Sequence, residues 1–104
     1  MEKGVGMNNR WELLAKEDPY FYIFTDFKGN LDEFWKSGEE QAGKVFSEVE
    51  SLLSGSDMVM EIGCGVGRLL IPMCSYFQKC RGVDISETMI DLLKRNADKF
   101  GIAN

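Results

Sequence analysis

The clearest hydrophobic pattern in the chain is an apolar stripe at helical spacing in the middle of the sequence. Apolar residues recur there at intervals of three and four, which is typical of a helix that buries one face. The stripe consists of Ala42, Val45, Phe46, Val49, Leu52 and Leu53. Ser37 and Glu40 fit a capping box before it, and Gly55 suits its C-terminal cap. The pattern therefore predicts a helix that begins after Ser37 and docks on a flat apolar surface.

Two short apolar runs follow, and each is typical of a buried strand in a parallel sheet. The first covers residues 57–62, which we expect to be the surface on which the preceding helix docks, and the second covers Cys80–Ile85. Between them, a glycine-rich turn at residues 63–67 leads into a predicted helix over about residues 68–77, which Pro72 is expected to bend. The inward side chains of this helix are expected to be Leu69, Leu70, Met73 and Phe77.

A last amphipathic pattern predicts a helix with Ser86 as its N-cap and Gly101 at its end. Its buried face is expected to carry Met89, Leu92, Leu93, Ala97 and Phe100. The order helix, strand, helix, strand, helix makes the two strands parallel and joins them by a right-handed crossover. The predicted fold class is therefore α/β.

The first part of the chain has a weaker pattern. Apolar residues at helical spacing predict a short helix over about Asn9–Lys16, which Pro19 brings to an end. The aromatic run at residues 20–24 has neither alternation nor helical period, so its secondary structure stays open. Residues 28–30 are expected to form a turn, and two more aromatic residues follow it.

Composition adds limits on function. The chain has 104 residues, is 44% hydrophobic, carries a net charge of −5 and contains no histidine. The lack of histidine excludes Ser-His-Asp triads, Cys-His pairs and histidine metal ligands. Net negative charge disfavours a nucleic-acid partner. No apolar stretch is long enough to predict a membrane span, and the first residues do not have the pattern of a secretory signal.

The chain has three cysteines, Cys64, Cys74 and Cys80, and their number and spacing bear on its location and on metal binding. An odd number without a regular framework favours reduced thiols in the cytoplasm. Because paired CxxC spacing is also absent, no zinc site is expected. We interpret the three thiols as small buried hydrophobic groups.

Candidate chemistry concentrates on the turn that follows the first strand. Gly63, Gly65 and Gly67 stand at every second position, which lets the backbone turn sharply and lets a ligand approach without Cβ atoms in the way. The helix beyond offers free amides to that ligand. Asp84 lies at the tip of the second strand, where a carboxylate can accept from the two hydroxyls of a ribose. These features predict a nucleoside-containing ligand across the carboxyl ends of parallel strands.

Two ligand classes use such a turn. The dinucleotide fingerprint of nicotinamide oxidoreductases needs its third glycine where Arg68 stands. The spacing GxGxG after an acid instead resembles motif I of class I S-adenosylmethionine (SAM) methyltransferases. The resemblance rests on residues 59–68, VMEIGCGVGR, and residues 82–86, GVDIS, and it covers about residues 39–104. It implies a Rossmann-like SAM methyltransferase fold with SAM as cofactor.

The resemblance also implies roles for the matching positions. The three glycines would form the floor beneath the methionine portion of SAM, and Cys64 would add backbone contacts. Glu61 would engage the ammonium group of the ligand, directly or through water. Asp84 would accept from the ribose hydroxyls, and Ile85 would pack against adenine. The motifs identify no catalytic residue and no metal ligand, and methyl transfer can proceed by placement alone.

Structural interpretations of the same residues stay open. Glu61 would then cap backbone amides, and Asp84 would cap the last helix. Arg68 is expected to be a solvated or salt-bridged helix residue.

The N-terminal segment is similar to one found in some bacterial members of the family. In that case Tyr20, Tyr22 and Trp35 would close over the SAM or acceptor site. The alternative is that these aromatic side chains cover the sheet edge as ordinary core.

The family implies more strands than the sequence predicts. Class I methyltransferases have a seven-stranded sheet, and this sequence predicts two strands, so we expect an incomplete fold. Residues 1–36 would be an N-terminal helical and aromatic cap segment, and residues 37–104 the first part of a SAM-binding domain. The implied function is SAM-dependent methyl transfer to a small-molecule acceptor, or SAM binding by an N-terminal fragment that has little activity alone. The alternative is a non-catalytic module that binds a partner, or forms a homodimer, through its open sheet edge.

Overall fold

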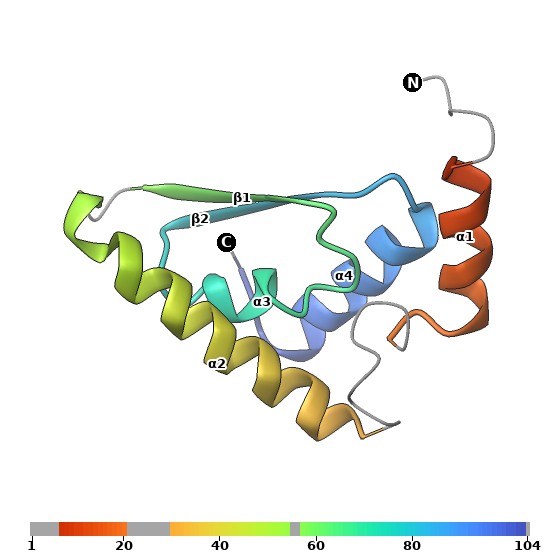
Figure 1. Cartoon of the computed structure of the whole chain (residues 1–104), viewed down its shortest axis with the longest axis horizontal. Helices are drawn as coiled ribbons and strands as arrows, with labels where there is room; N and C mark the ends of the chain where they lie inside the picture. Colours follow the sequence, from red (N-terminus) through yellow and green to blue (C-terminus); the bar gives the residue numbers. More distant parts are fainter. Residues whose placement is uncertain (1–6, 21–29, 55–56, 104) are drawn as a thin grey trace.

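The computed structural model describes residues 7–20, 30–54 and 57–103, which form a two-stranded sheet with helices around it (Figure 1). In chain order the elements are α1 (Met7–Glu17), α2 (Leu31–Val49), a 3₁₀ helix (Glu50–Leu52), β1 (Met58–Ile62), α3 (Leu70–Met73), β2 (Lys79–Val83) and α4 (Glu87–Lys99). The two strands are parallel, with Met58 opposite Lys79 and Ile62 opposite Val83. The predicted α/β class and the parallel strands are confirmed.

Helix α1 confirms the N-terminal helix and extends it slightly, to Met7–Glu17. It ends just before Pro19, as expected, because the residue before a proline avoids helical backbone angles. Most of the aromatic run and the first two residues of the predicted turn lie outside the described residues.

Helix α2 begins six residues before the predicted capping box, so that prediction is wrong. Asn30 is the N-cap, and its side chain accepts a hydrogen bond from the Glu33 amide at 3.3 Å. The Ser37 hydroxyl instead donates to the Phe34 carbonyl at 2.7 Å, a contact typical of a helix interior. The predicted boundary between residues 36 and 37 therefore lies inside one continuous helix.

Helix α2 packs against α3, not against β1 as expected (Figure 1). Ala42 is buried, but Val45 and Leu52 of the predicted stripe are exposed. Phe46 stacks on Tyr76 with ring centroids 4.5 Å apart and meets the Phe77 ring edge-on. Fewer positions of the stripe are therefore buried than its spacing predicts, because its partners are the short α3 and the residues just after it instead of a sheet.

Helix α3 is only Leu70–Met73, shorter than the predicted helix over residues 68–77. Pro72 has no amide hydrogen to donate to the carbonyl four residues earlier. Beyond it the chain tightens: the Ser75 amide donates to the Pro72 carbonyl at 3.2 Å, and the Tyr76 amide donates to the Met73 carbonyl at 2.9 Å. Both bonds span three residues, which ends the α-helix.

The sheet is covered on one face by α3 and the glycine turn. Gly82 of β2 lies so close to Leu70 and Cys64 that a Cβ there would be 2.6 Å and 2.7 Å from their side-chain atoms. The side chains of Met58, Met60, Ile62 and Val83 point to the other face and are exposed. The prediction of fully buried strands is therefore wrong for the described residues.

Helix α4 confirms both predicted ends. Ser86 is the N-cap and accepts from the Met89 amide at 3.1 Å, and Gly101 has a φ of +69° at the C-terminal end. Met89 is buried as predicted, whereas Phe100 is exposed.

The central core cluster joins α1, α2, α4 and the glycine turn. Its buried members are Ala15, Phe34, Val66 and Met89. Tyr20 and Trp35 pack against this cluster, which favours the core interpretation of these two aromatic residues. Tyr22 lies outside the described residues. Within the described ranges no helix is long and apolar enough to cross a membrane.

Candidate functional site

The glycine turn at the carboxyl end of β1 has one open side and one packed side. Gly63, Gly65 and Gly67 have φ angles of +75°, +56° and +101°, which favour glycine at all three positions. A Cβ on Gly63 would meet nothing within 4 Å, whereas a Cβ on Gly67 would lie 2.6 Å from Leu93 and 2.8 Å from Ile71. The turn is thus packed against Leu93 and Ile71 at Gly67 and open at Gly63, where a ligand can approach the backbone.

Asp84 lies against this turn, directly after β2. Its Oδ2 accepts from the Gly65 amide at 2.9 Å, and its Oδ1 accepts from the Ser86 amide at 2.9 Å. The carboxylate therefore both caps the approach to α4 and bridges to the glycine turn. Because a carboxylate has about four lone-pair positions, it retains acceptor capacity for two hydroxyl groups.

Glu61 lies near the end of β1, on the half-buried face of the sheet. Its Oε1 is buried and has no hydrogen-bond partner among the described residues. The pKa of Glu61 is raised to about 7, chiefly by burial. The Arg68 charge and the Leu70 amide lower this pKa, whereas the Asp84 charge raises it. The Leu70 contact agrees with a capping role, but the second oxygen stays unsatisfied.

Cys64 and Ile85 differ in exposure at this site. The Cys64 side chain is buried, its amide donates to the Val83 carbonyl at 3.1 Å, and burial raises the pKa of its thiol to about 11. Ile85 is 37% exposed beside the strand ends. The fold therefore brings all seven predicted site residues to one edge of the sheet, but Cys64 faces inward.

Arg68 links the site to α2, a contact that the sequence did not indicate. It precedes α3 and is not a helix residue, because α3 begins at Leu70. Its Nη1 donates to the Ser37 hydroxyl at 3.1 Å, and its Nη2 donates to Gln41 Oε1 at 2.6 Å. The guanidinium therefore holds the glycine turn against α2.

Asn96 is a second positioning residue that the sequence interpretation missed. It is only 8% exposed, and its Nδ2 donates to the Val66 carbonyl at 3.1 Å and to Tyr20 Oη at 3.3 Å. A buried amide with these partners fixes the glycine turn from the side of α4. The sequence does contain a signal for Asn96: it is a polar residue seven positions after Met89, on the face of the last helix that was predicted to be apolar.

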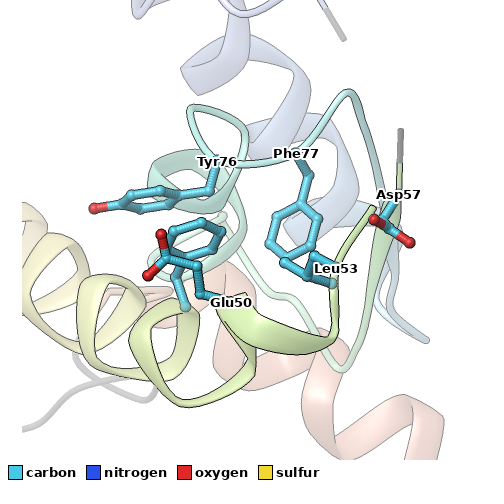
Figure 2. Close-up of a pocket in the computed structure, with 6 residues that line it drawn as sticks. Glu50, Leu53, Asp57, Tyr76 and Phe77 are labelled. Atoms are coloured by element: carbon cyan, nitrogen blue, oxygen red, sulfur yellow. The ribbon is translucent and has the colours of Figure 1, made fainter. Parts of the chain in front are cut away.

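Three cavities of the described residues lie away from this edge. The cavity in Figure 2, of about 190 Å³, is near the amino ends of the strands. It is lined by Phe46, Glu50, Leu53, Asp57, Tyr76 and Phe77. Cavities of about 360 and 270 Å³ lie beside α3. None of these three cavities includes a predicted site residue.

Comparison with known proteins identifies the glycine turn and the elements after it. Residues 59–104 match a family described as a methyltransferase domain. An uncharacterized RNA methyltransferase of Listeria monocytogenes is 34% identical over 81 residues, which are 76% of this chain and 18% of the relative. A probable cobalt-precorrin-6B C(15)-methyltransferase (decarboxylating) of Saccharolobus solfataricus is 37% identical over 90 residues, 80% of this chain and 44% of the relative.

The chain spans only part of the length of these relatives. It covers 18% of the Listeria protein and 44% of the Saccharolobus protein. No solved structure is significantly similar to it. The family match begins inside β1 and includes the glycine turn and Asp84, and the relatives carry methyltransferase names. The family match and these relatives support a class I S-adenosylmethionine-dependent methyltransferase domain that begins in β1.

Proposed function

We propose that the chain binds SAM at the carboxyl ends of β1 and β2 and takes part in methyl transfer. The observation that carries this proposal is the buried, unsatisfied Oε1 of Glu61 beside the glycine turn. A buried carboxylate oxygen without a hydrogen-bond donor lowers the stability of the fold, and a cationic ligand would supply the missing partner. When bound, SAM supplies a methyl group on a sulfonium centre, together with an ammonium group.

The charges of the site suit this ligand. Glu61 and Asp84 both lie at the turn, and the Asp84 charge acts on Glu61. The negative charges of Glu61 and Asp84 favour a ligand with an ammonium group and a sulfonium centre, because attraction to the ligand offsets the repulsion between the two carboxylates. Because Glu61 Oε1 is closed to solvent, the ammonium contact needs a bridging water or a small opening of the turn.

The remaining parts of the ligand have matching surfaces. Asp84 has lone pairs left for the ribose hydroxyls, and the open side of Gly63 leaves room for the methionine portion. Ile85 is exposed at the strand ends, where it would pack against adenine. The chain's own residues thus bind and orient the methyl donor, and orientation is the main requirement of an in-line methyl transfer.

Calorimetric titration with SAM tests this proposal. We expect the wild-type chain to bind, and Asp84→Asn to weaken binding by about tenfold to a hundredfold, because hydrogen bonds to a charged acceptor are lost. Asp91→Asn, an exposed acid on α4, is the matched control and should leave binding unchanged. Thermal melting of each variant checks that the fold is kept. A folded wild-type chain without affinity for SAM would contradict the proposal.

For the acceptor, we infer a small molecule. The net charge of −5 supports this choice, because an RNA acceptor favours a positive surface. RNA is the second candidate, since several relatives are named RNA methyltransferases. Salt-dependent binding of a structured RNA oligonucleotide would favour it. That none of the three cysteines forms a disulfide supports a cytoplasmic location.

Self-association through the sheet is a second candidate function, supported by the exposed apolar face. Ile62 at the end of β1 is 82% exposed. If a second copy covers this face, sedimentation velocity should show a dimer at high concentration, and Ile62→Glu should abolish it. Leu52→Glu is the matched control, because Leu52 is 80% exposed but lies off the sheet. A monomer at all concentrations would exclude this candidate.

A further inference from the structure

Helix α1 lies beside the N-terminus of α4 (Figure 1). Glu12 of α1 contacts this end of α4, although the two are more than seventy residues apart in the chain. Its Oε1 accepts from the Thr88 amide at 3.1 Å and from the Thr88 hydroxyl. Its Oε2 accepts from the Ser86 hydroxyl at 3.2 Å. Both carboxylate oxygens of Glu12 are therefore engaged on the first turn of α4.

Ser86 connects this contact to the candidate site. Its side chain is 1% exposed, and its hydroxyl accepts from the Met89 amide while donating to Glu12. Its own amide donates to Asp84 Oδ1 at 2.9 Å, and Asp84 Oδ2 accepts from the Gly65 amide. A continuous series of hydrogen bonds thus runs from α1 through Ser86 and Asp84 to the glycine turn.

The charge of Glu12 suits its place. The first amides of a helix carry no partner within the helix and favour a negative group. The Thr88 hydroxyl and amide, together with Ser86, lower the pKa of Glu12. The carboxylate is therefore ionised at neutral pH and makes charge-assisted hydrogen bonds to α4.

We propose that Glu12 is a positioning residue for Asp84, which holds the strand-end loop in the orientation that binds a ribose diol. The proposal rests on the proposed SAM-binding function. In this arrangement α1 supports the site but does not contact the ligand. Docking of α1 holds Ser86 in place through Glu12, and the Ser86 amide holds the Asp84 carboxylate. Loss of Glu12 should therefore reduce selectivity for the ribose hydroxyls as well as affinity.

The test compares Glu12→Gln with Glu17→Gln, an exposed acid on the same helix, as matched control. Each variant is titrated with S-adenosylhomocysteine and with its 2′-deoxy analogue. We expect Glu12→Gln to weaken binding of S-adenosylhomocysteine by up to about tenfold, because an Asp84 that is no longer held in place loses one hydrogen bond to the ribose. Binding of the deoxy analogue should fall less, so the preference for ribose narrows. Glu17→Gln should match the wild type.

Equal losses for both ligands would overturn the proposal, because a merely structural role of Glu12 would not distinguish them. Unchanged affinity would overturn it as well. Thr88→Val, which removes one contact to Glu12, should act in the same direction with a smaller effect if Glu12→Gln fails to fold. In the ligand-free chain, Glu12→Gln should shift the amide NMR signals of Ser86 and Gly65, whereas unshifted signals would overturn the proposal. A wild-type chain that binds neither ligand contradicts the proposed function, and these signals then still test the positioning role.

Discussion

Gly38→Ala is expected to destabilise the chain by about 3 kcal/mol, at the upper end of the usual cost of overpacking. Gly38 is buried in α2, where the helix meets the backbone that follows the glycine turn. A Cβ there would lie 2.0 Å from the Arg68 carbonyl oxygen, and backbone cannot rotate aside as a flexible side chain can. Helix α2 must therefore move away from the turn, which also disturbs the hydrogen bonds of Arg68.

Gly43→Ala, in the same helix, provides the matched control. A Cβ at Gly43 has Tyr76 Oη as its nearest neighbour, at an ordinary contact distance of 3.5 Å. Alanine should therefore stabilise α2 there by about 0.5–1 kcal/mol, because it loses less backbone entropy than glycine. Urea denaturation of both variants measures the two free energies of unfolding. Similar midpoints for the two variants would show that α2 does not press on Arg68.

Gly38 also explains why the start of α2 was predicted wrongly. Ser37 and Glu40 fit a capping box by local rules. Asn30 and Glu33 fit the same type of signal seven residues earlier, and Asn30 is the N-cap. Local sequence cannot choose between two such signals. Burial of Phe34 and the close approach at Gly38 decide the choice, and both depend on distant parts of the chain.

The candidate site shows the same division between local and distant information. The turn glycines, Asp84 and the Ser86 cap were predictable because strand, turn and cap chemistry act within a few residues. The contact of Glu12 with Thr88 joins residues 76 positions apart, and that of Arg68 with Ser37 joins residues 31 apart. Such pairs depend on how the helices pack, which the periodicity of one helix does not specify.

Glu61 is expected to make the ligand-free chain less stable as the pH rises from about 4.5 to about 7. Burial raises the folded-state pKa to about 7, whereas the unfolded value is near 4.5. In this interval the folded state holds a proton that the unfolded state has released, so deprotonation favours unfolding. The cost levels off above pH 7 and, allowing for partial solvent access, is on the order of 1–2 kcal/mol. Urea denaturation across this range should show a weaker decline for Glu61→Gln than for the wild type.

Binding of SAM should reverse the effect of that same group. An ammonium near Glu61 favours its ionised form, so the ligand should displace the proton that burial retains. Titrations at pH 7 in phosphate and in Tris should then give different enthalpies for the wild type, because the released proton is taken up by the buffer. Glu61→Gln should show no such difference and should bind SAM about tenfold more weakly. If wild type and variant release the same number of protons, Glu61 does not meet the ammonium group, and its unsatisfied oxygen needs another explanation.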